Sequence, residues 1–216
     1  MRFAETVARL EQLPDRLPEP PESLRPMLVV DGHLVPPDVA PEARDAAVLV
    51  LLFPGPDEEA WTVLTARPPG DLRHAGEVSF PGGAVEPGDR SIAAAALREA
   101  QEEVGLDPAQ CGLRVLGELG PVDVRVSGFR LHPVLAAARR RPALQRDAHE
   151  VSAIIEVPVR TFLAGAPIEM VEEQRSGWHL RYGAYPVGDY RVWGATARVL
   201  GQVGALLAAA GAVGAR

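Results

Sequence analysis

The stretch "FPGGAVEPGDRSIAAAALREAQEEVGL" (Phe80–Leu106) carries three acids, Glu99, Glu102 and Glu103, within five residues. Its alanine-rich part predicts a helix over Ile92–Val104, because alanine, leucine and glutamate are strong helix formers. In such a helix the three acids lie at positions i, i+3 and i+4, on one face. Like charges at these spacings destabilise a helix by roughly 0.2–0.5 kcal/mol per pair. Some other group must therefore offset the repulsion between the negative charges on this face of the helix.

The residues around this helix indicate how it begins and ends and how it meets a ligand. Asp89 or Ser91 can cap its first turn, and Gly105 can end it in the left-handed conformation. The "PGG" at Pro81–Gly83 predicts a tight turn from a strand to a loop. At such a turn bare backbone can approach a ligand, and a carbonyl can face a metal.

A divalent cation would compensate the acidic face. Carboxylates at positions i and i+4 can reach one ion, and magnesium prefers oxygen ligands while it keeps water or substrate oxygens in the rest of its octahedron. A glycine-rich turn, a loop and an acidic helix together favour a metal held against a phosphate. An acidic helix face can also be simply solvated, and the residues alone leave both interpretations open.

Length and composition limit the class of protein. The 216 residues, 47% of them hydrophobic, fit one domain with a full core. A net charge of −7 argues against a general nucleic-acid or membrane-surface binder, so an anionic ligand needs local basic groups or a cation. The single cysteine, Cys111, allows no intramolecular disulfide, and the N-terminus lacks a signal-peptide pattern, so we expect a cytoplasmic protein. The longest apolar stretch, Val199–Val213, is too short to span a bilayer.

The pattern along the chain predicts an α/β protein with a mixed sheet, because strands and helices interleave. A helix at residues 3–13 and a Pro-rich stretch at Leu13–Pro26 divide the chain into an N-terminal extension, residues 1–40, and a main domain, residues 41–216. The further elements that we expect are strands at Ala46–Phe53, Trp61–Arg67, Val78–Phe80, Arg114–Leu119, Val122–Val126, Phe129–Ala137, 151–159, 168–174 and 178–182, and helices near Val159–Leu163 and at Thr196–Ala210.

Gly83, Asp89 and "REAQEEVGL" (Arg98–Leu106) together closely resemble the signature box of the Nudix hydrolases, which cleave a nucleoside diphosphate linked to another group. The family box runs Gly, five residues, Glu, seven residues, then Arg-Glu-aliphatic-any-Glu-Glu-any-Gly-aliphatic. Here Asp89 replaces the first Glu, eight residues separate it from Arg98, and Ala100 occupies the aliphatic position. The resemblance implies the Nudix fold, a mixed β-sheet sandwiched between α-helices in an α/β/α sandwich.

The stretch "LTARPPGDLRHAGEVSFPGG" (Leu64–Gly83) narrows the resemblance, since it is similar to the extra motif ahead of the box in Nudix coenzyme A pyrophosphatases. The pieces "HEVSAIIEVPV" and "YRVWGATARVL" are similar to the same subgroup. The subgroup implies magnesium- or manganese-dependent hydrolysis of coenzyme A or a derivative to 3′,5′-ADP and 4′-phosphopantetheine. The alternatives are a Nudix pyrophosphatase for ADP-ribose or a dinucleotide, and a non-catalytic Nudix domain that senses a nucleotide. A sensing domain is expected to lack box acids, and all three helix acids are present here.

The resemblance also assigns roles to acids. Glu99 and Glu103 match the two acids that bind the essential metal, and the Gly83 carbonyl would join them. Glu102 would bind a second ion, or water on the first. Metal ions activate water against a pyrophosphate and a carboxylate then takes the proton, so a general base is also needed. Glu102 inside the box and Glu150 outside it are the two candidates.

The basic residues have expected roles too. Arg98 is expected to be structural and to fix the loop by pairing with Asp89 or Glu102. The run Arg139–Arg141 is either a solvated loop or a site for the 3′-phosphate of the ligand. The expected substrate contacts are Arg67, Arg73 and His74. The expected partner is a small nucleotide substrate of the coenzyme A class, bound by a monomer or a homodimer.

Overall fold

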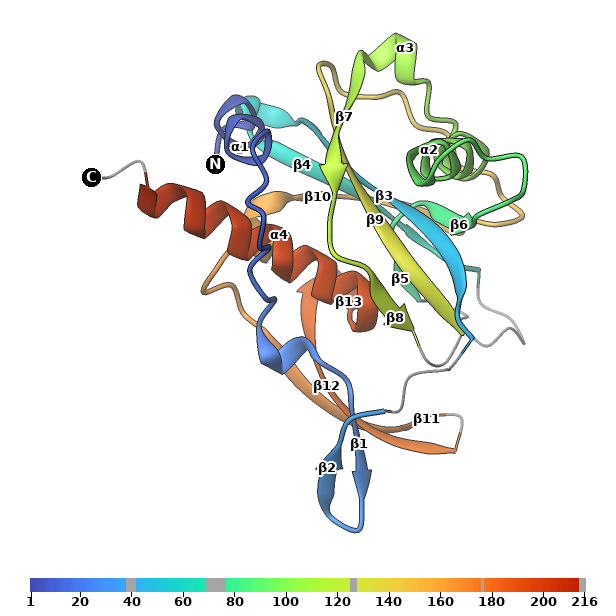
Figure 1. Cartoon of the computed structure of the whole chain (residues 1–216), viewed down its shortest axis with the longest axis vertical. Helices are drawn as coiled ribbons and strands as arrows, with labels where there is room; N and C mark the ends of the chain where they lie inside the picture. The colour runs from blue at the N-terminus through green and yellow to red at the C-terminus, as the bar shows by residue number, and fades with distance from the viewer. Residues whose placement is uncertain (38–41, 69–76, 125–127, 176, 214–216) are drawn as a thin grey trace.

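In the computed structural model, which describes residues 1–37, 42–68, 77–124, 128–175 and 177–213, a β-sheet lies between helices on both faces (Figure 1). Helix α2 packs on one face, and helices α1 and α4 pack on the other. The α/β/α sandwich expected from the sequence is confirmed. The helices are α1 (Phe3–Leu10), α2 (Ile92–Val104), α3 (Pro108–Cys111) and α4 (Gly194–Val213), and short 3₁₀ turns lie at η1 (Glu22–Leu24), η2 (Pro56–Glu58) and η3 (Val159–Phe162).

The main sheet has eight strands, and its central path runs in the order β10-β4-β3-β9-β7. Strands β3 and β9 are parallel and the other pairs are antiparallel, so the sheet is mixed, as predicted. The short strands β5, β6 and β8 pair with β4, β3 and β9. The strands are β3 (Arg44–Pro54), β4 (Ala60–Ala66), β5 (Val78–Ser79), β6 (Gly82–Ala84), β7 (Leu113–Glu118), β8 (Val122–Val124), β9 (Phe129–Ala138) and β10 (Ala153–Pro158).

Strand β3 is the centre of the core because both of its faces are buried. Its continuous apolar run predicts such a strand, since a sheet covered on both sides needs no polar alternation. Leu49 and Leu51 belong to the apolar cluster that includes α2, whereas Val50 and Leu52 belong to the cluster that includes α1 and α4. All four are at most 1% exposed. Successive residues of β3 therefore hold the two helical layers on opposite faces of the sheet.

A second, five-stranded sheet runs in the order β11-β12-β1-β2, with β13 paired to β12. The hairpin of β11 and β12 confirms two predicted strands, whereas β1 and β2, which lie within residues 1–40, were not predicted. Strand β1 pairs antiparallel with β12, with Met27 opposite Arg181 and Leu28 opposite Leu180. Strand β1 also pairs with β2 across Asp31-Gly32, where both residues have a positive φ. Asp-Gly between apolar residues is a local hairpin signal, and our prediction overlooked it. The strands are β1 (Met27–Val30), β2 (His33–Val35), β11 (Glu169–Arg175), β12 (Trp178–Val187) and β13 (Tyr190–Val192).

Two local predictions are wrong. The N-terminal helix ends at Leu10 rather than at residue 13, and Pro14 disfavours the helical conformation at the residue before it. The "PGG" is not a turn, because Gly82–Ala84 forms β6 and pairs with β3. Gly82 has a φ of +155°, and a Cβ there would lie 2.3 Å from the carbonyl oxygen of Ala47. Only glycine allows the two backbones to approach so closely.

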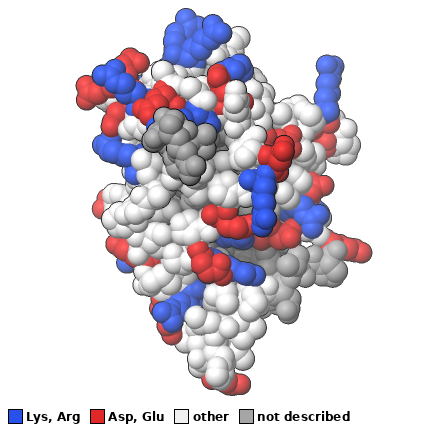
Figure 2. Space-filling model, turned by 60° about the vertical axis from the view of Figure 1, so that its left-hand side comes forward, with Lys and Arg blue, Asp and Glu red and all other residues white. Residues whose placement is uncertain are grey.

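Charged side chains of both signs share the surface. Figure 2 shows arginine and acidic residues interspersed over the face that it draws. On that face local arginines, rather than a field of one sign, are available to an anionic ligand. None of the helices formed by the described residues is long and apolar enough to cross a membrane.

We expect Leu51→Ala to lower the free energy of unfolding by about 2–5 kcal/mol, because this fully buried side chain would leave a cavity in the α2 layer. Leu34→Ala is the matched control, since Leu34 is 46% exposed on β2, and its effect should stay within about 0.5 kcal/mol. Urea denaturation measures both changes. Equal losses in the two variants would contradict the central place of β3 in the core.

Candidate active site

Helix α2 is fixed at both ends, which sets where its acids point. The Ser91 Oγ accepts a hydrogen bond from Ala94 N at 3.1 Å, so Ser91 rather than Asp89 is the N-cap. Gly105 ends the helix in the left-handed region with a φ of +64°, as predicted. The side that packs on the main sheet consists of small or apolar residues: Ala95, Ala96, Ala100 and Val104.

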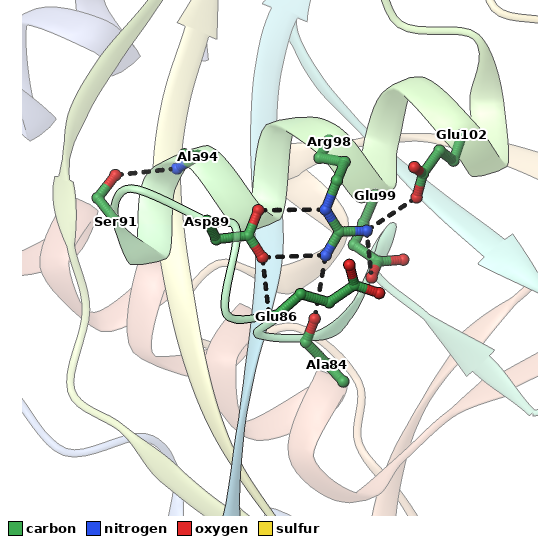
Figure 3. A network of polar contacts seen from close by, with 8 residues as sticks. All are labelled: Ala84, Glu86, Asp89, Ser91, Ala94, Arg98, Glu99 and Glu102. Atoms are coloured by element: carbon green, nitrogen blue, oxygen red, sulfur yellow. Dashed lines mark hydrogen bonds and ion pairs between the residues drawn. The ribbon is translucent and has the colours of Figure 1, made fainter.

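Arg98 gathers the preceding loop and two of the acids around one guanidinium group (Figure 3). Its Nε and Nη2 each lie 3.1 Å from a carboxylate oxygen of Asp89. Nη2 also donates to the carbonyl oxygen of Ala84 at 3.1 Å. Nη1 donates to Glu99 Oε1 at 3.0 Å and to Glu102 Oε2 at 2.9 Å. The arginine thus links the segment before α2 to the acidic face of the helix.

Asp89 closes the loop in front of α2. Its Oδ2 accepts a hydrogen bond from Glu86 N at 2.8 Å, in addition to the bonds from Arg98. The Arg98 bond, and after it the Glu86 bond, hold the pKa of Asp89 below its usual value. The hydrogen bond to Asp89 raises the pKa of Arg98, and the hydrogen bond to Glu99 raises it by a smaller amount. Both groups therefore stay charged over the physiological range.

Glu99 lies against the bare backbone of Gly83. Its side chain is 14% exposed. A Cβ on Gly83 would lie 2.5 Å from both carboxylate oxygens of Glu99, so a larger residue here would displace the carboxylate from this position. Burial raises the pKa of Glu99, and the bond from Arg98 opposes this rise. The charges of Glu102 and Glu150 raise the same pKa further.

Glu103 is more deeply buried, with 6% of its surface exposed. Gly82 N donates a hydrogen bond to its Oε2 at 3.1 Å. Burial raises the pKa of Glu103 to about 7, although the Gly82 bond and the charge of Arg67 lower it. The charges of Glu99 and Glu150 add to the rise in this pKa. Negative charge is therefore concentrated where α2 meets β6.

The oxygens at this point fit a divalent cation. Glu99 Oε2 and Glu103 Oε1 accept no hydrogen bond from the described residues, so each acid keeps one oxygen available. A cation would stabilise the charged forms that burial disfavours. Magnesium commonly binds through one or two carboxylates plus water and substrate phosphates. The described part of the chain holds no preformed group of three Asp, Glu, His or Cys side chains around one metal position, and Glu102 is bound to Arg98 instead.

Two further residues that the sequence singles out lie near these acids. Arg67 is exposed just after β4, and its charge acts on Glu103. Glu150 is exposed in the connection between β9 and β10, and its charge acts on both Glu99 and Glu103. The other two expected substrate contacts lie outside the described residues: Arg73 and His74.

The basic run Arg139–Arg141 makes its contacts beside α3 and β10. Arg140 Nη2 donates to the carbonyl oxygen of Gln110 at 2.6 Å. Arg141 forms an ion pair with Glu156 on β10. These two arginines are thus engaged with the protein's own groups rather than with the acids of α2.

Sequence reasoning missed two backbone groups that shape the site. One is the Gly82 N–H that binds Glu103, and the other is the Ala84 carbonyl that accepts from Arg98. Both belong to β6, which we expected to be a turn. The double glycine in the sequence indicated a close approach of the backbone. Only the pairing of β6 with β3 reveals which acid the backbone of β6 contacts.

The chain is similar to several known proteins. A family model described as "NUDIX domain" matches residues 43–176. The "Uncharacterized Nudix hydrolase NudL" of Cronobacter sakazakii is 39% identical over 160 residues, which cover 74% of this chain and 81% of that protein. The protein of the same name from Pectobacterium atrosepticum is 38% identical over 175 residues, covering 78% and 86%. A solved Ap4A hydrolase of C. elegans has a TM-score of 0.48 and 17% identity, covering 79% of this chain and 98% of that one.

We expect Asp89→Asn to lower the Tm of the metal-free protein, because it removes the charge that binds two nitrogens of Arg98. Asp123→Asn is the matched control, since its ion pair with Arg130 is open to solvent, with 36% and 47% of the side chains exposed. Exposed pairs contribute little to stability. Thermal unfolding compares the two, and an equal decrease would contradict the anchoring role of Asp89.

Glu103 should make the stability of the metal-free protein depend on pH. Its pKa of about 7 in the folded protein exceeds its ordinary value of 4.5, so between these values the folded chain holds a proton that the unfolded chain has released. Stability should therefore fall as pH rises through this range and level off above it. Glu103→Gln should flatten the profile, as should saturating magnesium in the wild type. Urea denaturation at about pH 5 and about pH 7.5 measures the slope, with a chelator in the metal-free samples and without one in the samples that contain magnesium. An unchanged slope in Glu103→Gln counts against the assignment.

Proposed function

The chain belongs to the Nudix hydrolase family, and on that premise we propose that its substrate is coenzyme A or a derivative of it. Hydrolysis of a pyrophosphate bond is the general activity of this family. The products from coenzyme A would be 3′,5′-ADP and 4′-phosphopantetheine. The proposed cofactor is magnesium or manganese, and the proposed partner is this small-molecule nucleotide.

The observation that carries the proposal is the convergence of carboxylates and one arginine where α2 meets β6. The charge of Glu150 acts on Glu99 and Glu103, and the charge of Glu99 acts on Glu103. The charge of Arg67 acts on Glu103 from the end of β4. A cation between the carboxylates, together with Arg67, would meet the negative oxygens of a pyrophosphate. A chain with a net charge of −7 needs such local positive charge to bind this substrate.

Glu99, Glu103 and the carbonyl of Gly83 are the groups of this chain that would hold the metal. When bound, a divalent cation neutralises phosphate oxygens and lowers the pKa of the attacking water. Arg98 orients Glu99 through the bond from Nη1 to Oε1, and Gly83 adjoins the same carboxylate. The substrate phosphates would complete the site, with Arg67 as a further contact. A carboxylate must also accept the proton of the attacking water.

Glu150 is better placed than Glu102 to accept that proton. The Oε2 of Glu102 lies 2.9 Å from Nη1 of Arg98, and Glu102 would have to break this ion pair before it could accept a proton. Glu150 has no hydrogen bond or ion pair with the rest of the described chain, so its carboxylate is available. We therefore assign the general base to Glu150, and the binding of a second ion, or of water on the first, to Glu102.

The choice of coenzyme A rests on the motif at Leu64–Gly83. Coenzyme A differs from ADP-ribose by a 3′-phosphate on the ribose and by the long pantetheine arm. A site built for it needs basic groups for the additional phosphate, and the motif supplies Arg67, Arg73 and His74. Arg67 is the member of this set in the described part of the chain, and its charge acts on an acid of α2.

Two glutamine variants separate the candidates for the base. Glu150→Gln should lower kcat at least about tenfold, a barrier change of about 1.4 kcal/mol, and leave manganese affinity near that of the wild type. Glu102→Gln should weaken manganese binding as well as turnover. Kinetics at varied manganese separate the two effects, with the exposed Glu118→Gln on β7 as a control. Full activity in both variants would remove both residues from the mechanism.

A substrate panel tests the choice of coenzyme A. We expect 3′-dephospho-coenzyme A to be hydrolysed at least about tenfold less efficiently in kcat/KM than coenzyme A, because charge-assisted bonds to the lost phosphate are worth about 1.5–3 kcal/mol. Arg67→Ala decides between the two phosphate contacts of Arg67. A smaller difference assigns it to the 3′-phosphate, whereas an equal loss of kcat/KM for both substrates assigns it to the pyrophosphate. Mass spectrometry should identify 3′,5′-ADP and 4′-phosphopantetheine as the products.

The same panel includes ADP-ribose and a dinucleotide polyphosphate as competitors. Faster turnover of either one under saturating magnesium would contradict the coenzyme A proposal and leave family membership intact. Binding of these nucleotides without hydrolysis of any of them would favour a sensing domain instead.

A further inference from the structure

The connection between β9 and β10 docks on the carbonyl end of α2. Figure 1 shows this connection passing alongside the helix. Gln145 N donates to the carbonyl oxygen of Val104 at 2.9 Å, and Asp147 N donates to that of Glu103 at 2.8 Å. The last carbonyls of a helix have no partner within it, so these bonds satisfy groups that would otherwise need water. The second bond ties the connection to a residue that we propose as a metal ligand.

Asp147 then closes a turn that contains Glu150. The Asp147 Oδ1 accepts a hydrogen bond from His149 N at 2.7 Å, which is the bond of an Asx turn. The carbonyl oxygen of Asp147 accepts from Val151 N at 2.9 Å. Arg146 Nη1 donates to the carbonyl oxygen of Val151 at 2.9 Å. Both sides of Glu150 are therefore fixed through Asp147.

The far side of the turn is fastened to β4. Ser152 N donates to the carbonyl oxygen of Ala66 at 2.8 Å. Ser152 Oγ lies 2.9 Å from the carbonyl oxygen of Ala66 and 3.1 Å from the carbonyl oxygen of Arg67, and its hydroxyl hydrogen can be donated to either. The turn thus spans from α2, which carries the acids, to the end of β4, where Arg67 lies. Glu150 lies between these two anchors.

We propose that Asp147 is a positioning residue that directs the Glu150 carboxylate toward Glu99 and Glu103. This inference rests on the proposed function, in which Glu150 accepts the proton. The side chain of Asp147 is the part that matters, because its Oδ1 holds the His149 amide next to Glu150. Without that bond the backbone link to α2 remains, but the peptide groups around His149 can rotate and Glu150 loses its defined direction.

Two substitutions at one position test the role. Asn keeps an oxygen that can accept from the His149 amide, whereas Ala removes it. With coenzyme A and ADP-ribose as parallel substrates, Asp147→Ala should lower kcat about tenfold and leave KM within about twofold, while Asp147→Asn should stay within about twofold of the wild type. Asp107→Ala is the matched control, because Asp107 Oδ1 accepts a similar bond from Gln110 N at 2.9 Å at the start of α3. Its kcat should be unchanged.

Hydrogen exchange gives a readout that does not depend on turnover. The His149 amide should exchange faster in Asp147→Ala than in the wild type or Asp147→Asn, while manganese affinity stays the same in all three. Unchanged exchange at His149 in Asp147→Ala, or equal kcat losses in the Ala and Asn variants, would overturn the positioning role. A wild-type protein that hydrolyses neither substrate would instead overturn the proposed function, and the exchange rates would still decide whether Asp147 orders the turn.

Discussion

The guanidinium group of Arg98 is the interaction on which the site depends, because it holds together carboxylates that repel one another. Two of its nitrogens bind Asp89 in the loop, and the third bridges Glu99 and Glu102 on the helix. One positive charge cannot balance all the acids present. Together with burial, the remaining negative charge raises the pKa of Glu99 and Glu103. The acidic face is thus partly compensated by the protein, and we propose that a divalent cation supplies the rest.

The layers of the fold hold the elements of this site in place. Buried residues of β3 hold α2 on one face of the sheet, and β6 pairs with β3 directly beneath the acids. Gly82 and Gly83 let the backbone of β6 reach Glu103 and Glu99, since a side chain at either position would collide with its surroundings. The site is therefore built from a helix and a strand, with the docked β9–β10 connection adding Glu150 from a third direction.

Local patterns in the sequence predicted those parts of the molecule whose causes are local. Neighbouring residues alone predict the helical periodicity of α2 and its end at Gly105. They also predict the buried strand β3 from its apolar run. Strands β1 and β2 were missed although Asp31-Gly32 marks the hairpin between them, and only the pairing of β1 with β12 depends on a distant segment. In the site, the common face of the three acids was predictable from helix geometry, whereas the Gly82–Glu103 bond and the docking of Asp147 on Glu103 depend on contacts between distant segments. The resemblance to a known family supplied the roles that no periodicity could indicate.

The proposed divalent cation site of Glu99 and Glu103 is central to the molecule, and a direct titration with manganese tests it. Calorimetry or paramagnetic resonance would compare the wild type with Glu99→Gln, Glu103→Gln and the exposed control Glu118→Gln. We expect each of the first two to weaken binding at least about tenfold, which corresponds to about 1.4 kcal/mol, while the control binds like the wild type. Wild-type manganese affinity in both Glu99→Gln and Glu103→Gln would contradict the account.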